Sequence, residues 1–164
     1  MVGKKQIERR IVIQAPAEAV WQVLADSRLL PQWVPAVDEV TECSSDGEAV
    51  GEVRRCNATL AGKSGRMVER CMEFTPMTRI AYVVDNETFG MRKMFDHYGF
   101  AISLESEDSE KTHVTLETHY TPRNPIYSLL NTLVMHRQFE KVCTEIVAGL
   151  KTFTESRHRA AGTS

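Results

Sequence analysis

The sequence lacks a long apolar run, and its charge is close to balanced. No stretch approaches the roughly 20 consecutive apolar residues that a membrane-spanning helix needs, so no integral membrane segment is expected. The formal net charge at pH 7 is −2, and the basic residues are scattered along the chain. This balance gives no electrostatic reason to expect nucleic acid or an anionic membrane as a partner. Glu8, Arg9 and Arg10 interrupt the apolar run that a signal peptide would need, so we expect a cytoplasmic protein.

Closely spaced cysteines and metal-ligand motifs are also missing. The four cysteines are Cys43, Cys56, Cys71 and Cys143. They form no Cys-x-x-Cys pair and have no histidine at ligand spacing, whereas disulfide frameworks and structural zinc sites usually show closer grouping. We therefore expect reduced thiols in or near the core, and neither a metal nor a cofactor.

Length and composition fit one globular domain. The chain has 164 residues, of which 42% are hydrophobic and 26% are charged, which is ordinary for a protein with a buried core. The sequence contains no internal repeat, linker or low-complexity stretch. We predict a single domain over residues 1–157, followed by a polar, flexible tail over residues 158–164.

The first part of the chain predicts a strand followed by two short helices. β-Branched residues alternate with polar residues over Gln6–Gln14, as in a half-buried strand. Ala15-Pro16 ends this pattern, and proline is well placed in the first turn of a helix. Apolar residues at helical spacing follow over Ala19–Leu24. A second short helix is predicted over Arg28–Trp33, and Pro35 ends it.

The middle of the chain alternates apolar and polar residues in runs that turn signals separate. No connection between these runs is long enough for a helix, so they predict an antiparallel meander rather than βαβ crossovers. The predicted strands are Val37–Cys43, Ala49–Leu60, Arg66–Phe74, Arg79–Val84, Met94–Leu104 and Thr112–Tyr120. The turn Asp85–Met91 either folds over an entrance as a lid or is an ordinary long hairpin turn.

The last third of the chain predicts a long amphipathic helix. Asn124 is a good N-cap and Pro125 a good first helical residue. Apolar residues then recur at three- and four-residue steps from Ile126 to Phe153. About thirty unbroken residues make roughly 45 Å of helix, which needs a large apolar surface to lie on. We predict an α+β fold in which a curved, seven-stranded antiparallel sheet wraps this helix and leaves an apolar cavity.

Several motifs in this order resemble a known superfamily. The opening motif is Ile11-Val-Ile-Gln-Ala-Pro-Ala-Glu-Ala-Val-Trp-Gln-Val-Leu-Ala-Asp26, followed by Leu30-Pro-Gln-Trp33. The later motifs are Val50-Gly-Glu-Val-Arg54, Gly65-Arg-Met-Val-Glu-Arg70 and Leu116-Glu-Thr-His-Tyr120. From Ile7 to Phe153 the chain resembles the START/Bet v 1-like helix-grip superfamily (SRPBCC). This superfamily includes START lipid-transfer domains, the birch-pollen-allergen fold, plant abscisic-acid receptors and bacterial polyketide cyclase/dehydrase proteins.

The resemblance implies a helix-grip fold with an internal cavity between the sheet and the C-terminal helix. Its implied ligand is a small hydrophobic molecule such as a lipid, isoprenoid, quinone or polyketide. Function stays open, because the superfamily includes carriers, receptors, aromatases and chaperone cofactors. The abscisic-acid receptors' Ser-Gly-Leu-Pro-Ala gate loop is not reproduced by Leu60-Ala-Gly-Lys63, which argues against a hormone receptor.

Candidate cavity residues include charged side chains, and the sequence identifies no catalytic residue. A charge in an apolar cavity is costly unless it is paired, so it would fix a polar ligand group or tune a proton transfer. The candidates are Trp33, Arg54, Glu69, Tyr82, Met94, His97, Tyr98, Glu117, Met135 and Phe139. Alternation leaves open which face of each strand is inward. Val68, Met72 and Phe74 compete for the interior with Met67, Glu69 and Cys71, and only one of His97 and Tyr98 can face inward.

Three functions compete for this fold. The first is a binding protein, monomeric or homodimeric, for a small hydrophobic ligand. The second is a polyketide cyclase, aromatase or dehydrase-like enzyme, in which an Arg, Tyr or His polarises a carbonyl. The third is a protein-interaction module, which requires an exposed apolar patch. If Arg54, Glu69, His97 and Glu117 all point inward, catalysis is favoured, and if all point to solvent, passive binding is favoured.

Overall fold

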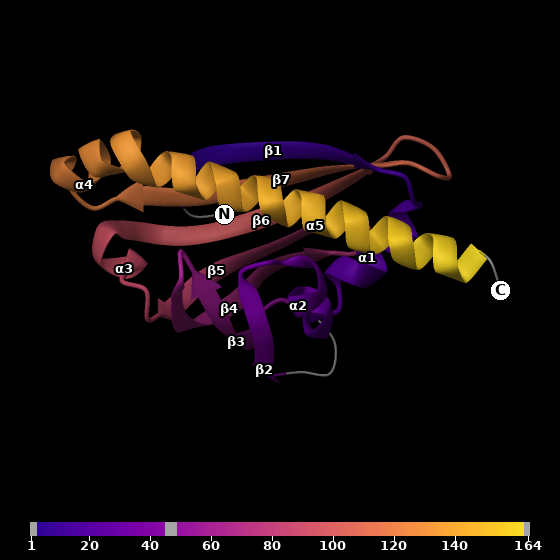
Figure 1. The fold of residues 1–164 in the computed structure, drawn as a ribbon, viewed down its shortest axis with the longest axis horizontal. Helices are drawn as coiled ribbons and strands as arrows, with labels where there is room; N and C mark the ends of the chain where they lie inside the picture. The colour runs from indigo at the N-terminus through magenta and orange to yellow at the C-terminus, as the bar shows by residue number, and fades with distance from the viewer. Residues whose placement is uncertain (1–2, 45–48, 163–164) are drawn as a thin grey trace.

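The computed structural model, which describes residues 3–44 and 49–162, contains one curved antiparallel sheet with a long helix against its concave face (Figure 1). The sheet has seven strands in the order β1-β7-β6-β5-β4-β3-β2. The strands are β1 (Lys5–Ile13), β2 (Val37–Cys43), β3 (Val53–Leu60), β4 (Lys63–Thr75), β5 (Arg79–Glu87), β6 (Phe95–Ser106) and β7 (Thr112–Pro122). This confirms the seven-stranded sheet predicted from the alternating runs.

Two short helical segments follow β1, as predicted. Pro16 precedes α1 (Ala17–Leu24), whose buried side is Val20, Trp21, Val23 and Leu24. A 3₁₀ turn, η1 (Ser27–Leu29), leads into α2 (Leu30–Trp33). The Asp26 carboxylate accepts a hydrogen bond from the backbone N–H of Arg28, which caps the 3₁₀ turn.

Tight turns and bulges shape the meander. Ala61 and Gly62 have φ values of 49° and 78°, which is the left-handed backbone that a two-residue hairpin turn between β3 and β4 requires. Strand β4 pairs with β5 through register shifts at Val68/Glu69 and Cys71/Glu73, and β6 pairs with β7 through a shift at Asp96/Gly99. Such bulges bend a strand and increase its twist, which favours a sheet that curves around a helix. The predicted turn Asp85–Met91 is shorter than expected, because β5 continues to Glu87 and a short helix, α3 (Met91–Met94), begins at Met91.

The C-terminal helix is interrupted, whereas the sequence predicts an unbroken one. α4 (Pro125–Leu130) continues through a π-helical turn, η2 (Asn131–Met135), into α5 (His136–Gly162). Asn124 caps α4 through a side-chain hydrogen bond to the N–H of Tyr127, as expected. Residues 158–162, expected to be a frayed tail, are helical, and the Nε2 atom of His158 lies 3.3 Å from the Glu110 carboxylate.

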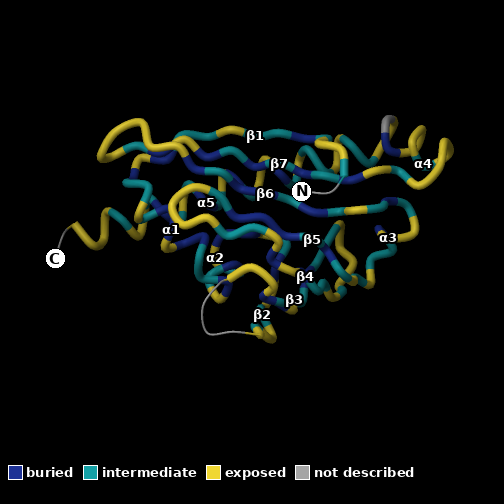
Figure 2. The backbone as a smooth tube through the Cα atoms, turned by 180° about the vertical axis from the view of Figure 1, so that it is seen from behind, coloured by how far each residue is buried: buried dark blue, intermediate teal, exposed yellow. Residues whose placement is uncertain are grey.

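Helix α5 packs on β1 and β7 and on the two short helices α1 and α2 (Figures 1 and 2). A Cβ atom on Gly149 would lie 2.1 Å from the carbonyl oxygen of Trp33, so only glycine allows α2 to approach α5 this closely. The main buried cluster lies beneath this contact, and a second cluster forms around Met91, Phe95 and Tyr120 near the start of α5. Within the described part of the chain, no helix has both the length and the apolar character of a membrane crossing.

Candidate functional site

The orientation of the side chains on β3 and β4 determines which charged groups are buried in the interior. On β3, Arg54 and Cys56 are buried, whereas Arg55 between them is exposed. On β4, Glu69 and Cys71 are buried, and Met72 is exposed. The choice between the two faces of β4 is therefore resolved in favour of Met67, Glu69 and Cys71. Phe74 nevertheless also packs on the core, because the bulge after Cys71 shifts the alternation.

Arg54 and Glu69 form a fully buried ion pair. They are directly opposite each other in the β3–β4 register, and the Nε atom of Arg54 lies 2.7 Å from Oε2 of Glu69. Their side chains are only 4% and 6% exposed. Nη1 of Arg54 also donates a 3.0 Å hydrogen bond to Oγ of Ser27, in η1. The pair thus joins the sheet to the segment between α1 and α2.

Aromatic rings cover the guanidinium group of Arg54. Its central carbon lies 3.8 Å from the centre of the Tyr82 ring and 5.9 Å from that of Phe100. The Tyr82 and Phe100 rings stack on each other with centroids 5.7 Å apart. A cation over the face of an aromatic ring is stabilised by the ring quadrupole, most strongly where water is excluded. The charge of Arg54 is therefore held by Glu69 on one side and by aromatic faces on another.

The electrostatics around this pair keep Arg54 charged and Cys56 neutral. Burial disfavours the Arg54 cation, but the charge and hydrogen bond of Glu69, together with Tyr82 and Cys56, outweigh this penalty, so the pKa of Arg54 is raised above its usual value. Burial, with a further contribution from Glu69, raises the pKa of the Cys56 thiol to about 12. Arg54 therefore stays charged and the Cys56 thiol stays protonated near neutral pH.

A wall of aromatic rings lies between the pair and the start of α5. Tyr98 on β6 stacks against Phe139 on α5, with centroids 5.8 Å apart and an interplanar angle of 27°. The ring of Tyr120 on β7 contacts that of Phe139 edge-on, with centroids 5.3 Å apart, and the centroids of the Phe95 and Tyr120 rings are 4.8 Å apart. The Tyr120 hydroxyl donates a 3.1 Å hydrogen bond to Oδ1 of Asn131, which ties the π-helical turn to β7.

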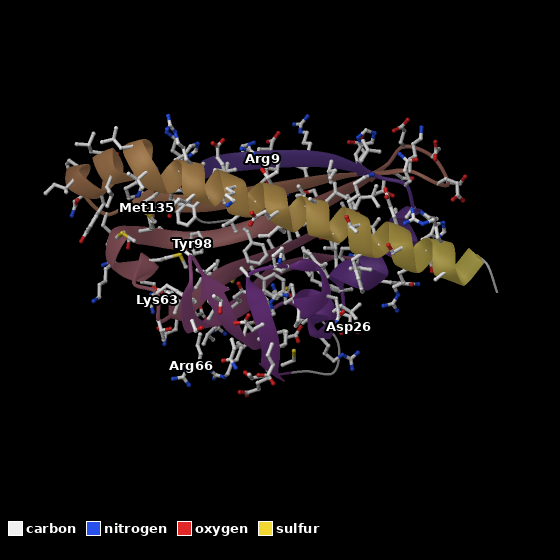
Figure 3. The ribbon with its side chains drawn as sticks, viewed as in Figure 1. Arg9, Asp26, Lys63, Arg66, Tyr98 and Met135 are labelled. Atoms are coloured by element: carbon white, nitrogen blue, oxygen red, sulfur yellow. The ribbon has the colours of Figure 1, made fainter. Side chains whose placement is uncertain are left out.

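Of the neighbours His97 and Tyr98, only one of which was expected to face inward, Tyr98 does so, and it lies beneath α5 (Figure 3). Burial raises the pKa of its phenol well above the usual value, and nearby charges, including that of Glu69, add to the shift. Its hydroxyl therefore stays protonated and is a hydrogen-bond donor at neutral pH.

Solvent reaches part of this interior. The side chains of Met67, Tyr98, Phe100, Phe139 and Met135 face inward or pack on the inner aromatic cluster, yet each remains partly exposed. Helix α5 rests on the β1–β7 side of the sheet and on α1 and α2.

The other predicted site residues divide between inside and outside. Trp33 is buried in the main cluster at the end of α2, and Met94 and Met135 pack on the second cluster. His97 lies outside the interior, because the β6 bulge gives it a φ of 56° and leaves it exposed. Glu117 also lies outside, where its carboxylate pairs with Arg79 and Lys5 at 3.1 and 3.2 Å.

Sequence reasoning missed several interior residues. No sequence pattern points to Ser27 as a partner of Arg54, or distinguishes Asn131 from other positions in the long helix. Phe100 carried no signal that distinguished it from core packing. Thr118 is buried on the inner face of β7, and its hydroxyl has no hydrogen-bond partner among the described residues. Only the alternation of β7, with Leu116 and Tyr120 on either side, could have indicated its facing.

Two open hollows lie at the surface, each with a volume of about 540 Å³. The first lies between α2 and α5, with Trp33, Pro35, Gly149 and Phe153 in its lining. The second includes residues 86–90, Arg92, Lys93, Arg123 and Lys63. They share no lining residue.

Sequence comparison adds a family to this geometry. The family model described as "Polyketide cyclase / dehydrase and lipid transport" matches residues 4–155. The chain belongs to this family. No curated protein sequence matches the chain significantly.

Solved structures share the fold of this family member. An aromatase/cyclase from a Streptomyces species superposes with a TM-score of 0.75 at 24% identity, covering 95% of this chain and 96% of that one. A START superfamily protein from Mycobacterium smegmatis gives 0.67 at 16% identity, with coverages of 96% and 99%. Norcoclaurine synthase from Thalictrum flavum gives 0.70 at 15% identity, with coverages of 95% and 96%. At these identities the likeness establishes the helix-grip fold of the family member, and no more.

Proposed function

We propose that the protein binds a small hydrophobic molecule between the sheet and α5. The observation that carries this proposal is the partly exposed row of inward aromatic and methionine side chains, of which Tyr98 and Phe139 are the centre. Such side chains form adaptable apolar walls for ligands. The family description, which includes lipid transport, supports the same reading.

The polar groups of the interior favour a ligand with little charge. Arg54 is already neutralised by Glu69, so it does not require an anionic group on the ligand. The Tyr98 phenol and the Thr118 hydroxyl could each hydrogen-bond to a carbonyl or hydroxyl oxygen. A buried hydroxyl usually has a partner, and a bound molecule would supply one for Thr118. Lipids, isoprenoids, quinones and polyketide-like molecules have this combination of apolar body and few oxygens.

A polyketide cyclase or aromatase-like enzyme is the second candidate. It is favoured by the buried, protonated phenol of Tyr98 and the buried Arg54–Glu69 pair, and by the fold shared with a Streptomyces aromatase/cyclase. Binding is preferred because His97 and Glu117, two of the four residues whose inward orientation would favour catalysis, lie outside. An enzyme of this class would release water from a poly-β-ketone substrate, which mass spectrometry detects. Tyr98→Phe would then abolish turnover while leaving binding of an apolar probe intact.

The binding proposal is tested by titrating the delipidated full-length protein with a neutral fluorescent probe such as N-phenyl-1-naphthylamine. Two matched variants on β4 locate the site. Met67→Trp adds bulk on the inner face, and Met72→Trp adds the same bulk on the outer face, where Met72 is 45% exposed. We expect Met67→Trp to weaken probe binding at least tenfold and Met72→Trp to leave it unchanged. Native mass spectrometry of the untreated protein identifies any molecule that co-purifies.

Absence of saturable probe binding would count against the proposal, as would equal effects of the two variants. Thermal unfolding of both variants establishes that any loss of binding is not a loss of fold.

A further inference from the structure

The outer face of α4 and η2 carries a contiguous apolar surface. Ile126, Leu129 and Leu133 are 77%, 62% and 62% exposed, and Leu130 and Val134 are 39% and 44% exposed. Their three- and four-residue spacing places them along one side of the helix. We call these five side chains the apolar stripe. Residues coloured as exposed dominate this segment in Figure 2, at the end of the molecule where α4 lies.

The apolar stripe is not the face that packs on the fold. On the inner side, Asn131 accepts its hydrogen bond from Tyr120, and Met135 packs on the second cluster. An amphipathic helix normally buries its apolar side. Here the inner side of the helix already packs on the fold, and a second set of large apolar side chains remains exposed to water. Exposed patches of this kind mark interaction sites.

Basic side chains lie at both ends of the stripe. Arg123 precedes α4, and Arg137 lies one helical turn beyond Leu133; both are exposed. The N–H of Arg123 donates a 2.9 Å hydrogen bond to the carbonyl of Met94, which joins α3 to the start of α4. Arg92 and Lys93 of α3 therefore lie beside it, and they line one surface hollow together with Lys63 and Arg123.

This basic rim is poorly neutralised. Among the described residues, Lys63, Arg92 and Lys93 form no ion pair, and only Arg123 pairs, with Asp96 at 2.8 Å. Glu87 lies in the same hollow, but its carboxylate is occupied by backbone N–H groups, including those of Gly90 and Arg92 at 2.8 Å each. A local excess of positive charge therefore exists on a chain whose net charge is −2.

We propose that the apolar stripe and its basic rim dock on the surface of an anionic lipid bilayer. Apolar side chains beside Lys and Arg are the combination by which a helix lies in the interfacial plane of a membrane. Each basic residue near such a surface adds attraction to anionic headgroups. A second copy of the chain fits less well, because a two-fold contact through the stripe would bring two basic rims together.

Docking in this way turns one end of the interior toward the bilayer. Met135 and Lys63 lie at the same end of the molecule (Figure 3), and Met135 borders both the stripe and the aromatic cluster that contains Tyr98. The docking surface does not depend on ligand binding, so vesicle binding and probe binding are measured separately, and either can fail alone.

Vesicle cosedimentation of the full chain tests the proposal. The vesicles are phosphatidylcholine alone or phosphatidylcholine with about one third phosphatidylglycerol. We expect binding to the mixed vesicles that exceeds binding to phosphatidylcholine at least tenfold and is largely lost at about 0.5 M salt. Leu129→Ser/Leu133→Ser should reduce binding at least tenfold, and Arg92→Gln/Lys93→Gln should reduce it severalfold. The matched control is Val50→Ser/Met72→Ser, which removes two exposed apolar side chains elsewhere and should bind as the original protein does.

The proposal is overturned if the original chain binds neither vesicle, or if the stripe variant and the control bind equally well. Analytical ultracentrifugation tests the main alternative, which is a dimer formed through the apolar stripe. A dimer that Leu129→Ser/Leu133→Ser dissociates, in a protein that does not bind vesicles, would assign the stripe to a second copy. Unchanged melting temperatures for the variants exclude unfolding as the cause of lost binding.

Discussion

Arg54 and Glu69 are cross-strand partners in the interior, and the neighbouring strands carry the same type of pair at the surface. The Nε–Oε2 distance is 2.7 Å for Arg54 and Glu69 between β3 and β4, and 2.8 Å for Arg55 and Glu42 between β2 and β3. The inner side chains are 4% and 6% exposed, and the outer ones 51% and 60%. Two pairs of nearly identical geometry thus differ in their access to water.

Removing one partner of each pair should therefore give very different losses of stability. Glu69→Ala leaves the Arg54 charge buried without its counter-ion, and we expect it to cost about 3–5 kcal/mol. Glu42→Ala should cost about 0–1 kcal/mol, because water screens the exposed pair. The double variant Arg54→Met/Glu69→Leu removes both charges and should recover most of the loss. Urea unfolding measures all three, and similar losses for Glu69→Ala and Glu42→Ala would contradict this account.

Gly149→Ala should destabilise the protein although alanine is the better helix former. Alanine gains about 1 kcal/mol of intrinsic helix propensity over glycine. Its Cβ atom would meet the carbonyl oxygen of Trp33 at 2.1 Å, so α2 and α5 must move apart, with a net cost of about 1–3 kcal/mol. Gly162→Ala, near the end of the same helix with open space around it, is the control and should be neutral or slightly stabilising. Thermal unfolding of both variants checks the difference.

The architecture was predictable from the sequence because the two periodicities are clear. Alternation over the strands and three- to four-residue spacing after Asn124 reflect burial on one face, which is a local property of each segment. The order of elements then left little choice of topology for a meander. The π-helical turn was not predictable, because the Tyr120–Asn131 hydrogen bond that accompanies it joins β7 to the helix.

The site was less predictable, because bulges determine which side chains of a strand point into the interior. The shift after Cys71 returns Phe74 to the core side, and the shift near His97 turns that residue outward while Tyr98 enters. A period-two pattern cannot locate such insertions in advance. The basic rim escaped sequence analysis for a related reason, because Lys63, Arg92 and Arg123 are far apart in the chain and meet only in the folded protein.

Glu117 should make stability fall at acidic pH. Burial alone would raise the pKa of its carboxyl, but hydrogen bonds from Arg79 and Lys5 outweigh burial and hold this pKa below the usual value of 4.5. A carboxyl with a lowered pKa in the folded state contributes stability above its unfolded pKa, and this contribution is lost as pH falls through the folded value. Glu117→Gln should therefore flatten the dependence of unfolding free energy on pH below about 4.5.

The control for this pH experiment is Glu105→Gln. Glu105 is exposed and forms no ion pair among the described residues, so its substitution should leave the slope as it is in the original protein. Urea unfolding at a series of pH values gives both slopes. Parallel curves for Glu117→Gln and the original protein would show that the Arg79 and Lys5 contacts do not favour the ionised carboxylate.

Thiol reactivity should single out Cys43. Burial raises the pKa of Cys56 to about 12 and that of Cys143 to about 11, and Cys71 is fully buried with its Sγ donating to the carbonyl of Glu73. Cys43 is only partly buried, at the end of β2. Because the thiolate is the reactive species and must be reached by the reagent, we expect one fast thiol in the folded protein at about pH 8.

Ellman's reagent measures this reactivity, and it should detect all four thiols once the protein is unfolded in urea. Cys43→Ser should abolish the fast reaction, whereas the matched variant Cys143→Ser should leave it unchanged. A fast phase that persists in Cys43→Ser would mean that solvent and reagent enter the interior as far as Cys56, Cys71 or Cys143. Repeating the reaction with a saturating apolar probe would then show whether ligand occupancy closes that path, because only a reagent that passes through the interior would be blocked.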